Sequence, residues 1–284
     1  MIFSVIIPTY NRSDFLIKCL DSLTPCIQML DTSQYEVIVS DDGEDGLTKQ
    51  LVNEAYPWVR WVKGPGRGPA SNRNNGARLA KGEWLVFIDD DCISTPDLLI
   101  GYKNVIDGQE NVRALEGKIV PDSWEKLDED MAECPINITG GCFWSANICL
   151  QKSLFESISG FDEDFFLAAR EDQDLYLRIK RVCEVVFVSE AVVIHPVRIA
   201  TFNHKVKNIF KSIDNWFVYV SKHNYLYVNK NLIKFAFHPY TYQMLVSARN
   251  MKLKSFFYNF LYVSLGIPYF IKKTMFEGEK LVKR

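Results

Sequence analysis

The sequence predicts an α/β fold: a Rossmann-like, mostly parallel central sheet with flanking helices, followed by a C-terminal helical extension. The first observation is that short β-branched apolar runs alternate with helical patterns over the first hundred residues. The second is that acidic residues follow two of these runs: Asp41 and Asp42 after one, and the triplet Asp89, Asp90 and Asp91 after another. The third is that aromatic residues at helical spacing, separated by lysines, dominate the chain beyond residue 200.

Strands and helices are expected in alternation through the first half of the chain. Buried strands are predicted at residues 3–7, 35–39, 58–62 and 84–88, and helices at 14–23, 48–55 and 70–80. Beyond residue 97 the pattern is mixed, with strands expected at 112–120, 142–150 and 185–188 and a helix at 171–181. We therefore expect one domain over residues 1–200, whose halves meet near residue 95, and an extension over residues 201–284.

The composition is that of an enzyme-sized globular protein. The 284 residues are 48% apolar, enough to bury a substantial core, and the net charge of -2 gives no electrostatic footprint for nucleic acid. The seven cysteines form no CxxC pair, so reduced thiols are expected. The first residues lack the basic leader and long apolar region of a signal peptide, which favours a cytoplasmic location.

Asp89, Asp90 and Asp91 follow the apolar run at residues 84–88, where a strand of such a sheet opens towards a ligand crevice. Three adjacent carboxylates repel one another, and a divalent cation relieves this repulsion. Magnesium or manganese held by one or two carboxylates completes its coordination with water and substrate phosphates, so a metal here implies a phosphorylated substrate. The alternative is a solvated acidic turn before a helix that starts near Thr95. The triplet alone leaves these two interpretations even.

The region between the two acidic strand ends has the features of a mononucleotide site. No GxGxxG motif follows the first strand, which argues against a dinucleotide cofactor. Asp41 or Asp42 can accept a hydrogen bond from a base N–H group, while ribose hydroxyls face Asp89. The glycine-rich segment 64–76 and the helix it enters carry three arginines suited to phosphate oxygens, Arg67, Arg73 and Arg78. A surface loop with solvated arginines is the alternative.

Six short motifs, taken in their order and spacing, resemble those of family 2 glycosyltransferases, which have the GT-A fold. They are FSVIIPTYNR at residues 3–12, EVIVSDDG at 36–43, SNRNNG at 71–76, WLVFIDDD at 84–91, GFDEDFF at 160–166 and REDQDL at 170–175. Each motif is loose by itself, but together they are specific over residues 3–196. The resemblance implies an inverting enzyme that moves a sugar from a nucleoside diphosphate sugar, with a UDP-sugar as the expected donor.

The resemblance also implies roles for residues of the donor half, about residues 1–95. Pro8, Thr9 and Asn11 are expected to line the nucleotide pocket. Asp41 would contact the base with Asp42 beside it, and Arg73 would lie near the base or the diphosphate. The triplet matches the DxD motif, so Asp91 would ligate Mn²⁺ or Mg²⁺, Asp89 would face the ribose or donor sugar, and Asp90 would be a further substrate-binding acid. His195 falls where related enzymes place a further metal ligand, although a structural histidine is the alternative.

Transfer of a sugar to a hydroxyl also needs a base, because the hydroxyl is a poor nucleophile. Asp172, in the motif that resembles the family's ED pair, is the expected base, with Glu171 and Asp174 as supports. A helix N-terminal acid stabilised by the helix dipole is the alternative interpretation, and it is compatible with catalysis. In the acceptor half, about residues 96–200, Trp144 is expected either to stack on an acceptor sugar or to pack in the core.

The C-terminal extension carries two apolar patterns. Apolar residues from Phe202 to Val220 recur at helical spacing and predict one amphipathic helix. Residues 251–273 form an aromatic segment flanked by lysines, too marginal for a transmembrane span but suited to an anionic membrane surface. Its candidate inserting residues are Phe256, Phe257, Tyr262, Tyr269 and Phe270. A helix packed on the domain or in a homodimer is the alternative. The expected location is therefore the cytoplasm, with peripheral association at the cytoplasmic membrane face.

Two other classes of protein are considered. A metal-dependent phosphatase of the haloacid dehalogenase type also has acids after a strand, but its nucleophile normally ends the first strand, whereas here the triplet follows the fourth. A catalytically inactive sugar-binding module would have lost some of the acids, yet Asp41, Asp91 and Asp172 are all present. The expected protein is thus an enzyme of polysaccharide or glycoconjugate biosynthesis that glycosylates a hydroxyl of a glycan or lipid-linked acceptor.

Overall fold

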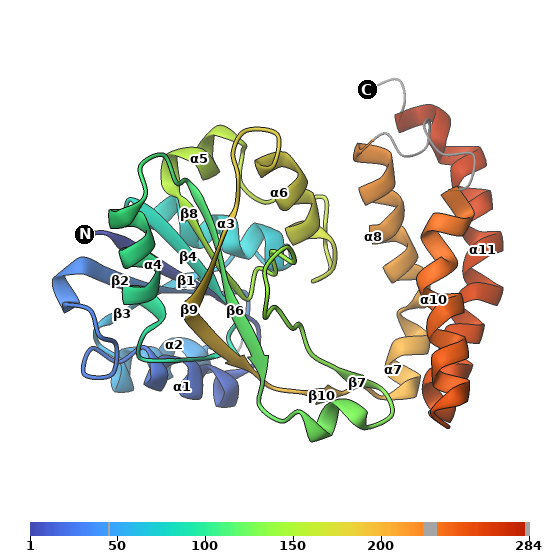
Figure 1. Ribbon diagram of the computed structural model, residues 1–284, viewed down its shortest axis with the longest axis horizontal. Coiled ribbons are helices and arrows are strands. Elements are labelled where there is room, and N and C mark those ends of the chain that lie inside the picture. Colours follow the sequence, from blue (N-terminus) through green and yellow to red (C-terminus); the bar gives the residue numbers. More distant parts are fainter. Residues whose placement is uncertain (45, 224–231, 282–284) are drawn as a thin grey trace. The chain divides into compact units, whose positions relative to one another are not determined.

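The computed structural model describes residues 1–44, 46–223 and 232–281 (Figure 1). The chain forms two compact units, each made of two stretches of sequence. The first unit comprises Met1–Asp122 and Cys134–Pro196, and the second comprises Ser123–Glu133 and Val197–Arg284. All the residues predicted for catalysis, donor binding and metal binding lie in the first unit.

An eight-stranded sheet in the order β3-β2-β1-β4-β8-β6-β9-β5 forms the centre of the first unit. Its strands are β1 (Phe3–Thr9), β2 (Tyr35–Asp41), β3 (Val59–Lys63), β4 (Trp84–Ile88), β5 (Ile93–Ser94), β6 (Ala114–Pro121), β8 (Asn147–Gln151) and β9 (Val186–His195). Strand β1 pairs in parallel with β2 and β4, and β2 with β3, while β8 lies antiparallel between β4 and β6. The predicted α/β class with a mostly parallel donor half is confirmed.

Helices cover both faces of this sheet (Figure 1). They are α1 (Ser13–Ser22), α2 (Leu47–Ala55), α3 (Pro69–Leu79), α4 (Leu98–Gly108), α5 (Lys152–Ser157) and α6 (Glu171–Ile179). Phe3, Val5 and Ile7 of β1 pack into one apolar cluster with α1, α2 and α4, whereas Ile6 packs into another with α3, α5 and α6. Alternate residues of a strand face opposite sides, so a continuous apolar run is what a strand covered on both faces requires.

The strand predicted over residues 142–150 begins later, at Asn147. Gly140 and Gly141 have φ of 86° and 87°, and Phe143 has φ of 50°, all in the left-handed region that an extended strand excludes. The buried carboxylate of Glu116 accepts hydrogen bonds from the backbone N–H groups of Gly141, Cys142 and Phe143. Because these donors are turned onto one carboxylate, residues 140–143 form a loop rather than sheet.

The second unit is a group of helices with a two-stranded ribbon. It contains β7 (Ala132–Glu133), which pairs with β10 (Arg198–Ile199), and the helices α7 (Phe202–Lys207), α8 (Ile209–Lys222), α10 (Leu232–Arg249) and α11 (Leu253–Leu281). The single helix predicted from Phe202 to Val220 is interrupted at Asn208, so that prediction is wrong in its continuity. The Asn208 side chain donates to the carbonyl of His204, a local bond that competes with the helical ladder.

Helix α11 packs against α8 and α10, and this corrects part of the expectation for residues 251–273. Tyr262 and Phe270 are buried among aromatic rings of the unit, including Phe217 of α8 and Phe237 of α10. Tyr269 donates to Asp214 on α8. The buried rings of Tyr262 and Phe270 therefore hold the helices together and are not accessible to a membrane surface. Over the described residues, none of the helices has the length and apolar character needed to cross a bilayer.

Residues 123–133 belong to the second unit because they are bonded to its helices and ribbon. Asp130 accepts hydrogen bonds from the backbone N–H groups of Lys254 and Ser255 at 2.8 and 3.0 Å, and so caps the start of α11. Lys252 donates to the carbonyl of Leu127 at 3.4 Å. An insertion between β6 and β8 thus supplies part of the framework of the C-terminal helices.

Candidate active site

The ends of β1 and β4 bring the first predicted site residues together. Thr9, the last residue of β1, donates its hydroxyl to the carboxylate of Asp90 at 2.8 Å. Pro8 is buried one residue earlier, opposite Ser40 in the register of β1 and β2. Because β1 and β4 are parallel neighbours, their carboxyl ends meet at one edge of the sheet, as the position of the triplet predicted.

Asp41 and Asp42 follow β2 at the same edge, and both carboxylates already accept hydrogen bonds. Asp41 accepts from the backbone N–H of Gly43 at 2.8 Å and from Nε1 of Trp61 at 3.1 Å. Asp42 accepts from the backbone N–H of Gly66 at 2.8 Å, and burial raises its pKa. Asp42 therefore shapes the glycine-rich loop, while Asp41 is held in place at the end of the sheet.

The amide of Asn72 ties the ends of β1 and β2 to α3. Its Nδ2 donates to the carbonyls of Thr9 and Ser40 at 3.2 and 2.9 Å. The side-chain oxygen of Asn11 lies beside Gly43, where an added Cβ would meet it at 2.6 Å. Asn11 itself has φ of 51°, a left-handed conformation that asparagine tolerates better than most residues. The loop after β1 thus turns sharply against the loop after β2.

Arg73 of α3 connects the DxD acids to the start of α6. It is buried and donates to Asp89 at 2.6 Å and to Glu171 at 3.1 Å. The sequence placed Arg73 near the base or the diphosphate, and the structure places it between two acids of the predicted site. Within the described part of the chain, Nε of Arg73 and Oε2 of Glu171 are buried without a hydrogen-bond partner, which suits a site completed by a ligand.

Arg12 is a site residue that the sequence reasoning did not single out. Its guanidinium forms ion pairs with Asp90 and Asp91, each at 2.7 Å, and its ring contact is Phe15 at 4.8 Å. Arg12 closes the PTYNR motif, so its position directly after the first strand was the available signal. Arg12 therefore supplies a counter-charge to two of the three clustered carboxylates, and Arg73 supplies one to the third.

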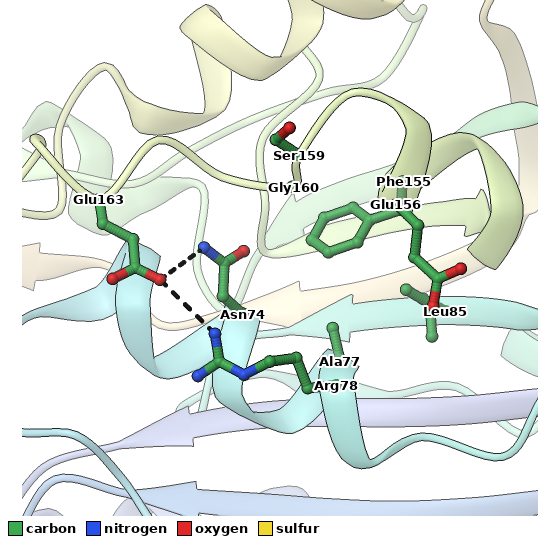
Figure 2. A pocket seen from close by; sticks show the side chains of 9 residues that line it. All are labelled: Asn74, Ala77, Arg78, Leu85, Phe155, Glu156, Ser159, Gly160 and Glu163. Atoms are coloured by element: carbon green, nitrogen blue, oxygen red, sulfur yellow. Dashed lines mark hydrogen bonds and ion pairs between the residues drawn. The ribbon is translucent and has the colours of Figure 1, made fainter.

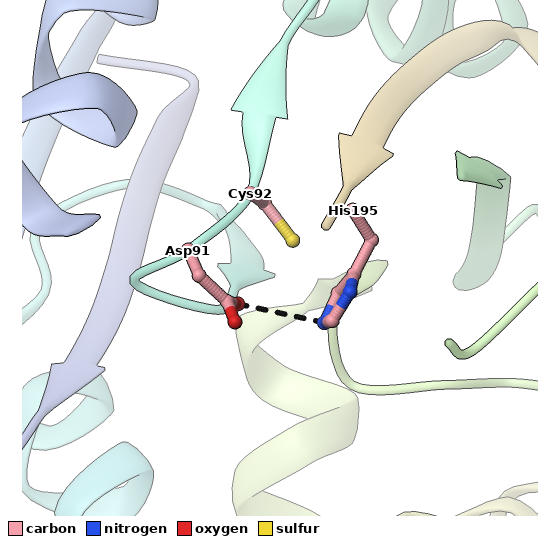
Figure 3. A group of neighbouring side chains, drawn as sticks. All are labelled: Asp91, Cys92 and His195. Atoms are coloured by element: carbon pink, nitrogen blue, oxygen red, sulfur yellow. Dashed lines mark ion pairs between the residues drawn. The ribbon is translucent and has the colours of Figure 1, made fainter. Parts of the chain in front are cut away.

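Asp91 and His195 face each other at the ends of β4 and β9 (Figure 3). The Nε2 of His195 lies 3.4 Å from Oδ1 of Asp91, and its Nδ1 lies 2.9 Å from the carbonyl of Pro196. Burial lowers the pKa of His195, so the neutral ring donates from Nδ1 and turns the Nε2 lone pair towards Asp91. Two ligands 3.4 Å apart can share one cation at about 2.1 Å from each.

Cys92 completes this group of potential ligands, since its sulfur, Asp91 and His195 offer atoms within 4.8 Å of one another. Burial keeps the pKa of the Cys92 thiol well above its ordinary value, and the thiol donates to the carbonyl of Ala146 at 3.8 Å. A neutral thiol is a poor ligand for a hard cation. The residues present therefore fit manganese or magnesium through Asp91 and His195, with Cys92 as a packing residue.

The three acids at the start of α6 differ in their partners. Glu171 pairs with Arg73, and Asp174 accepts twice from Arg178 at 2.9 and 2.7 Å. Asp172 accepts from the backbone N–H groups of Gln173 and Ser145, and in the described residues it makes no ion pair. Burial raises the pKa of Asp172 above its ordinary value, and the nearby charge of Asp89 raises it further.

The loop before β8 brings Trp144 next to the predicted base. Trp144 is half-buried, packs against the core on one side of the sheet and donates from Nε1 to the carbonyl of Ile136 at 3.3 Å. The packing alternative for Trp144 is thus observed, and its stacking on an acceptor sugar stays a prediction. The next residue, Ser145, supplies the N–H bonded to Asp172. Glu116, which was not predicted as a site residue, holds this loop in place by accepting hydrogen bonds from its backbone N–H groups.

Glu163 fastens the loop that leads to α6 (Figure 2). It accepts from Asn74 at 3.1 Å and from Ser71 at 3.0 Å, and it lies 3.8 Å from Arg78. A hollow of about 230 Å³ beside it runs between α3 and α5. The hollow contains none of the residues predicted for catalysis, so Glu163 acts by positioning the chain ahead of α6.

Known proteins resemble this chain in sequence and in fold. Residues 4–110 match the model of the family described as glycosyl transferase family 2. Over these residues, which are less than half of the chain, the sequence matches glycosyltransferase family 2, and the fold is GT-A. The resemblance seen in the sequence is confirmed.

Individual relatives match parts of the chain. The poly(ribitol-phosphate) beta-glucosyltransferase of Bacillus spizizenii is 31% identical over 155 residues, which are 50% of this chain and 24% of that protein. The chain spans less than two thirds of the length of the curated relatives it matches first. Among solved structures, residues 1–349 of TarS of S. aureus with UDP-GlcNAc has a TM-score of 0.58 at 17% identity, covering 92% of this chain and 91% of that one. The mannosyltransferase PcManGT of Pyrobaculum calidifontis with GDP-Man and Mn²⁺ has a TM-score of 0.54 at 19% identity, covering 76% and 63%.

The pairing of Arg12 with Asp90 and Asp91 predicts a metal-dependent effect on stability. In the presence of EDTA, Arg12→Met should lower the free energy of unfolding by about 2 kcal/mol, because clustered carboxylates lose their counter-charge. Added Mn²⁺ should recover part of this loss by supplying positive charge at Asp91. Thermal denaturation with EDTA and with Mn²⁺ measures both effects.

Arg67→Met is the matched control, since Arg67 is exposed and pairs with Glu163 at 3.3 Å, a surface contact worth about 1 kcal/mol or less. It should change stability little and should not alter the response to Mn²⁺. An Arg12→Met protein as stable as the parent in EDTA would contradict the role of Arg12 as a counter-charge.

Proposed function

We propose that this protein is an inverting, metal-dependent glycosyltransferase that uses a nucleoside diphosphate sugar, with a UDP-sugar as the expected donor. The observation that carries the proposal is the chain of contacts from Asp89 through Arg73 to Glu171, with Asp172 beside it. It links the acids suited to a diphosphate donor to the acid suited to deprotonate an acceptor. A family 2 enzyme needs these two functions in one cleft.

The donor half supplies binding groups for each part of the nucleotide. The loops after β1 and β2 would hold the base and ribose through Thr9, Asn11 and Asp41, with Pro8 shaping the pocket. Asp89, which is less buried than its two neighbours, would face the ribose or donor sugar. Arg73 lies between the DxD acids and α6, and its buried Nε has no hydrogen-bond acceptor among the described residues, so it could donate to the diphosphate. Asp90 would keep this end of β4 in place through Thr9 and Arg12.

Asp91 and His195 would hold the divalent cation. When bound, the cation would stabilise negative charge on the diphosphate leaving group. The proximity of the neutral Nε2 of His195 to a carboxylate oxygen of Asp91 supports this assignment. PcManGT, whose solved structure resembles this chain in fold, is described in complex with GDP-Man and Mn²⁺.

Asp172 would act as the base. It would take the proton of the acceptor hydroxyl as the hydroxyl oxygen bonds to the anomeric carbon, while the bond from that carbon to the diphosphate oxygen breaks and the electron pair leaves with the nucleotide. Glu171 and Asp174 each form an ion pair with an arginine, so of the three acids Asp172 is the one whose carboxylate makes only hydrogen bonds to backbone N–H groups in the described structure. Attack opposite the leaving group inverts the anomeric configuration.

The two rival classes fit the geometry less well. In a phosphatase of the haloacid dehalogenase type the nucleophilic Asp would end the first strand, but β1 ends at Thr9. An inactive sugar-binding module has no need for a buried acid of raised pKa beside a paired arginine. Release of UDP from a UDP-sugar, compared with release of phosphate from phosphoesters, distinguishes the enzyme from both.

The acceptor is proposed to be a hydroxyl of a glycan or lipid-linked glycan in polysaccharide or glycoconjugate synthesis. Support comes from the described activities of relatives, which include a poly(ribitol-phosphate) beta-glucosyltransferase and a glucosyltransferase of Campylobacter jejuni named for an undecaprenol-linked glycan. The choice of acceptor would rest on the loop that carries Trp144, next to the base.

We also place the enzyme at the cytoplasmic face of a membrane. Helix α11 has an exposed apolar strip formed by Leu253, Phe257 and Phe260, which are 65%, 54% and 49% exposed. Together with Phe202 and Leu261 these residues line an apolar hollow bordered by Lys254. Apolar side chains next to lysines suit the interface of an anionic leaflet.

The metal site predicts that UDP binds more tightly with Mn²⁺ than with EDTA, and that Asp91→Asn removes this gain. Calorimetric titration with UDP measures it directly. Asp107→Asn on the exposed side of α4 is the control and should keep the full metal effect. Equal affinity of the parent for UDP with Mn²⁺ and with EDTA would show that the metal does not take part in donor binding.

The assignment of Asp172 predicts a loss of transfer without a loss of donor. Asp172→Asn should keep UDP-sugar affinity within a few-fold while the transfer rate falls by roughly 10² or more, the scale of general-base catalysis. Since burial raises the pKa of Asp172, parental kcat should rise with pH across a range above the ordinary 3.8 of an aspartate, as the base loses its proton.

Asp174→Asn is the matched variant for this test, because Asp174 lies on the same helix turn but is bonded to Arg178. Its loss should affect stability more than the shape of the pH profile. If Asp172→Asn transfers sugar near the parental rate, the base is another residue, and Glu171 becomes the next candidate.

The exposed strip of α11 predicts salt-sensitive binding to vesicles that contain phosphatidylglycerol. The double variant Phe257→Ser and Phe260→Ser should stay at the bottom of a flotation gradient, whereas the parent floats at low salt. Met29→Ser, at a residue 62% exposed on the first unit, is the control and should float like the parent. A parent that does not float, but sediments as a dimer dissociated by the same double variant, would assign the strip to a homodimer instead.

A further inference from the structure

The second unit contains a large polar cavity that the proposed chemistry does not use. It has a volume of about 580 Å³ and lies between segment 127–133, α7, α10 and α11. Ligand pockets in proteins typically measure about 300–1,000 Å³, so it is large enough for a small ligand of two or three sugar rings. None of the donor or metal residues belongs to it.

The cavity has a defined framework. Asp130 caps α11 through the N–H groups of Lys254 and Ser255, and Glu133 forms an ion pair with Lys205 of α7. Lys205 in turn lies 4.9 Å from the ring centre of Tyr258. Three elements from different parts of the sequence are thus fixed around one space, so its shape is preorganised rather than left to loose side chains.

The lining is rich in neutral hydrogen-bonding groups. Gln243, Ser247 and Asn250 come from α10, and Ser255 and Asn259 come from α11. Ser247 and Asn259 are buried, while Gln243 and Asn250 are exposed and accessible to a ligand. Amide and hydroxyl groups both donate and accept, which is the combination that sugar hydroxyls need.

Aromatic rings complete the lining. Tyr240 packs one face on Tyr262, with the ring centres 3.7 Å apart and the planes 14° apart, and Tyr240 also borders the cavity. Burial raises the pKa of Tyr258, so its hydroxyl stays neutral and available for hydrogen bonding. An aromatic side chain fixed by stacking offers an apolar surface to the C–H faces of a sugar ring at little entropic cost.

The charges of the lining disfavour phosphorylated ligands. Lys205 is paired with Glu133, and Lys252 donates to the carbonyl of Leu127, while Glu129 adds a negative charge. Among the described residues that line the cavity there is no arginine, the residue best suited to phosphate. A nucleotide diphosphate or a phosphorylated headgroup would therefore bind poorly, whereas an uncharged polyhydroxylated ligand matches the whole lining.

This cavity is also separate from the exposed apolar strip of α11. At 100° per residue, Tyr258 and Asn259 lie on the side of the helix away from Phe257 and Phe260. One face of α11 thus carries the apolar strip, and the opposite, polar face lines the cavity. The two surfaces can be occupied at the same time.

We propose that the cavity between α10, α11 and segment 127–133 is a binding site for a neutral glycan segment, distinct from the catalytic cleft. The proposal rests on the proposed function in one respect, since a glycan acceptor is what such a site would hold for a glycosyltransferase. Its role would be to retain an acceptor chain through sugar units remote from the reacting hydroxyl.

Saturation-transfer NMR tests the site with linear glucose and N-acetylglucosamine oligosaccharides of three to five units as probes. The parent should bind at least one of these series, and the variant Gln243→Ala with Asn250→Ala should weaken binding about tenfold, which corresponds to about 1.4 kcal/mol. Tyr240→Ala should weaken it as well. Tyr242→Ala is the control, because Tyr242 is 57% exposed on the same helix but does not line the cavity.

The same samples are titrated with UDP and Mn²⁺. Oligosaccharide binding that persists at saturating UDP and is lost only in the cavity variants establishes a second site. Absence of binding to every probe, or binding unchanged in both cavity variants, overturns the proposal. Because UDP affinity is measured separately, a failed glycan site is distinguishable from a failed transferase assignment.

Discussion

The candidate active site depends on one buried guanidinium, that of Arg73. Burying a charge is costly unless it is paired, and Arg73 is paired on two sides, with Asp89 after β4 and with Glu171 at the start of α6. These partners come from distant parts of the sequence. The pairing fixes the distance between the sheet edge that would bind the donor and the helix that would carry the base.

The same principle accounts for the other polar groups of the first unit. Arg12 neutralises Asp90 and Asp91, Glu163 accepts from Ser71 and Asn74, and Glu116 accepts from a row of backbone N–H groups. Each joins a loop to a strand or helix that is already held by apolar packing. Precision at the site thus comes from buried hydrogen bonds, while the apolar sheet supplies the free energy that allows them.

Local pattern predicted most of the donor half, because each parallel strand is a continuous apolar run and each helix has a clear period. It failed where long-range contacts decide the backbone. Cys142 and Phe143 were predicted to begin a strand, but their backbone N–H groups bond to Glu116, which lies on β6. Among the site residues, the acids could be predicted from their place after strands. Their partners could not, since the pairing of Arg73 with Glu171 spans 98 positions and leaves no local signal. The motif that contains Arg12 could be recognised in the sequence, but the sequence did not show that its side chain points towards Asp90 and Asp91.

The second unit is discontinuous in sequence, and this affects the order in which the protein can be assembled. Residues 123–133 leave the ribosome before β8, α6 and β9, yet their partners β10 and α11 come after all of these. During synthesis, residues 123–133 therefore lack their partners β10 and α11 until the rest of the first unit has been translated. The first unit can fold around this segment of its chain, but the second unit cannot be completed until α11 has been translated. A stop codon at the start of α11 would therefore leave a complete first unit whose segment 123–133 lacks the N–H groups of Lys254 and Ser255 that bond to Asp130.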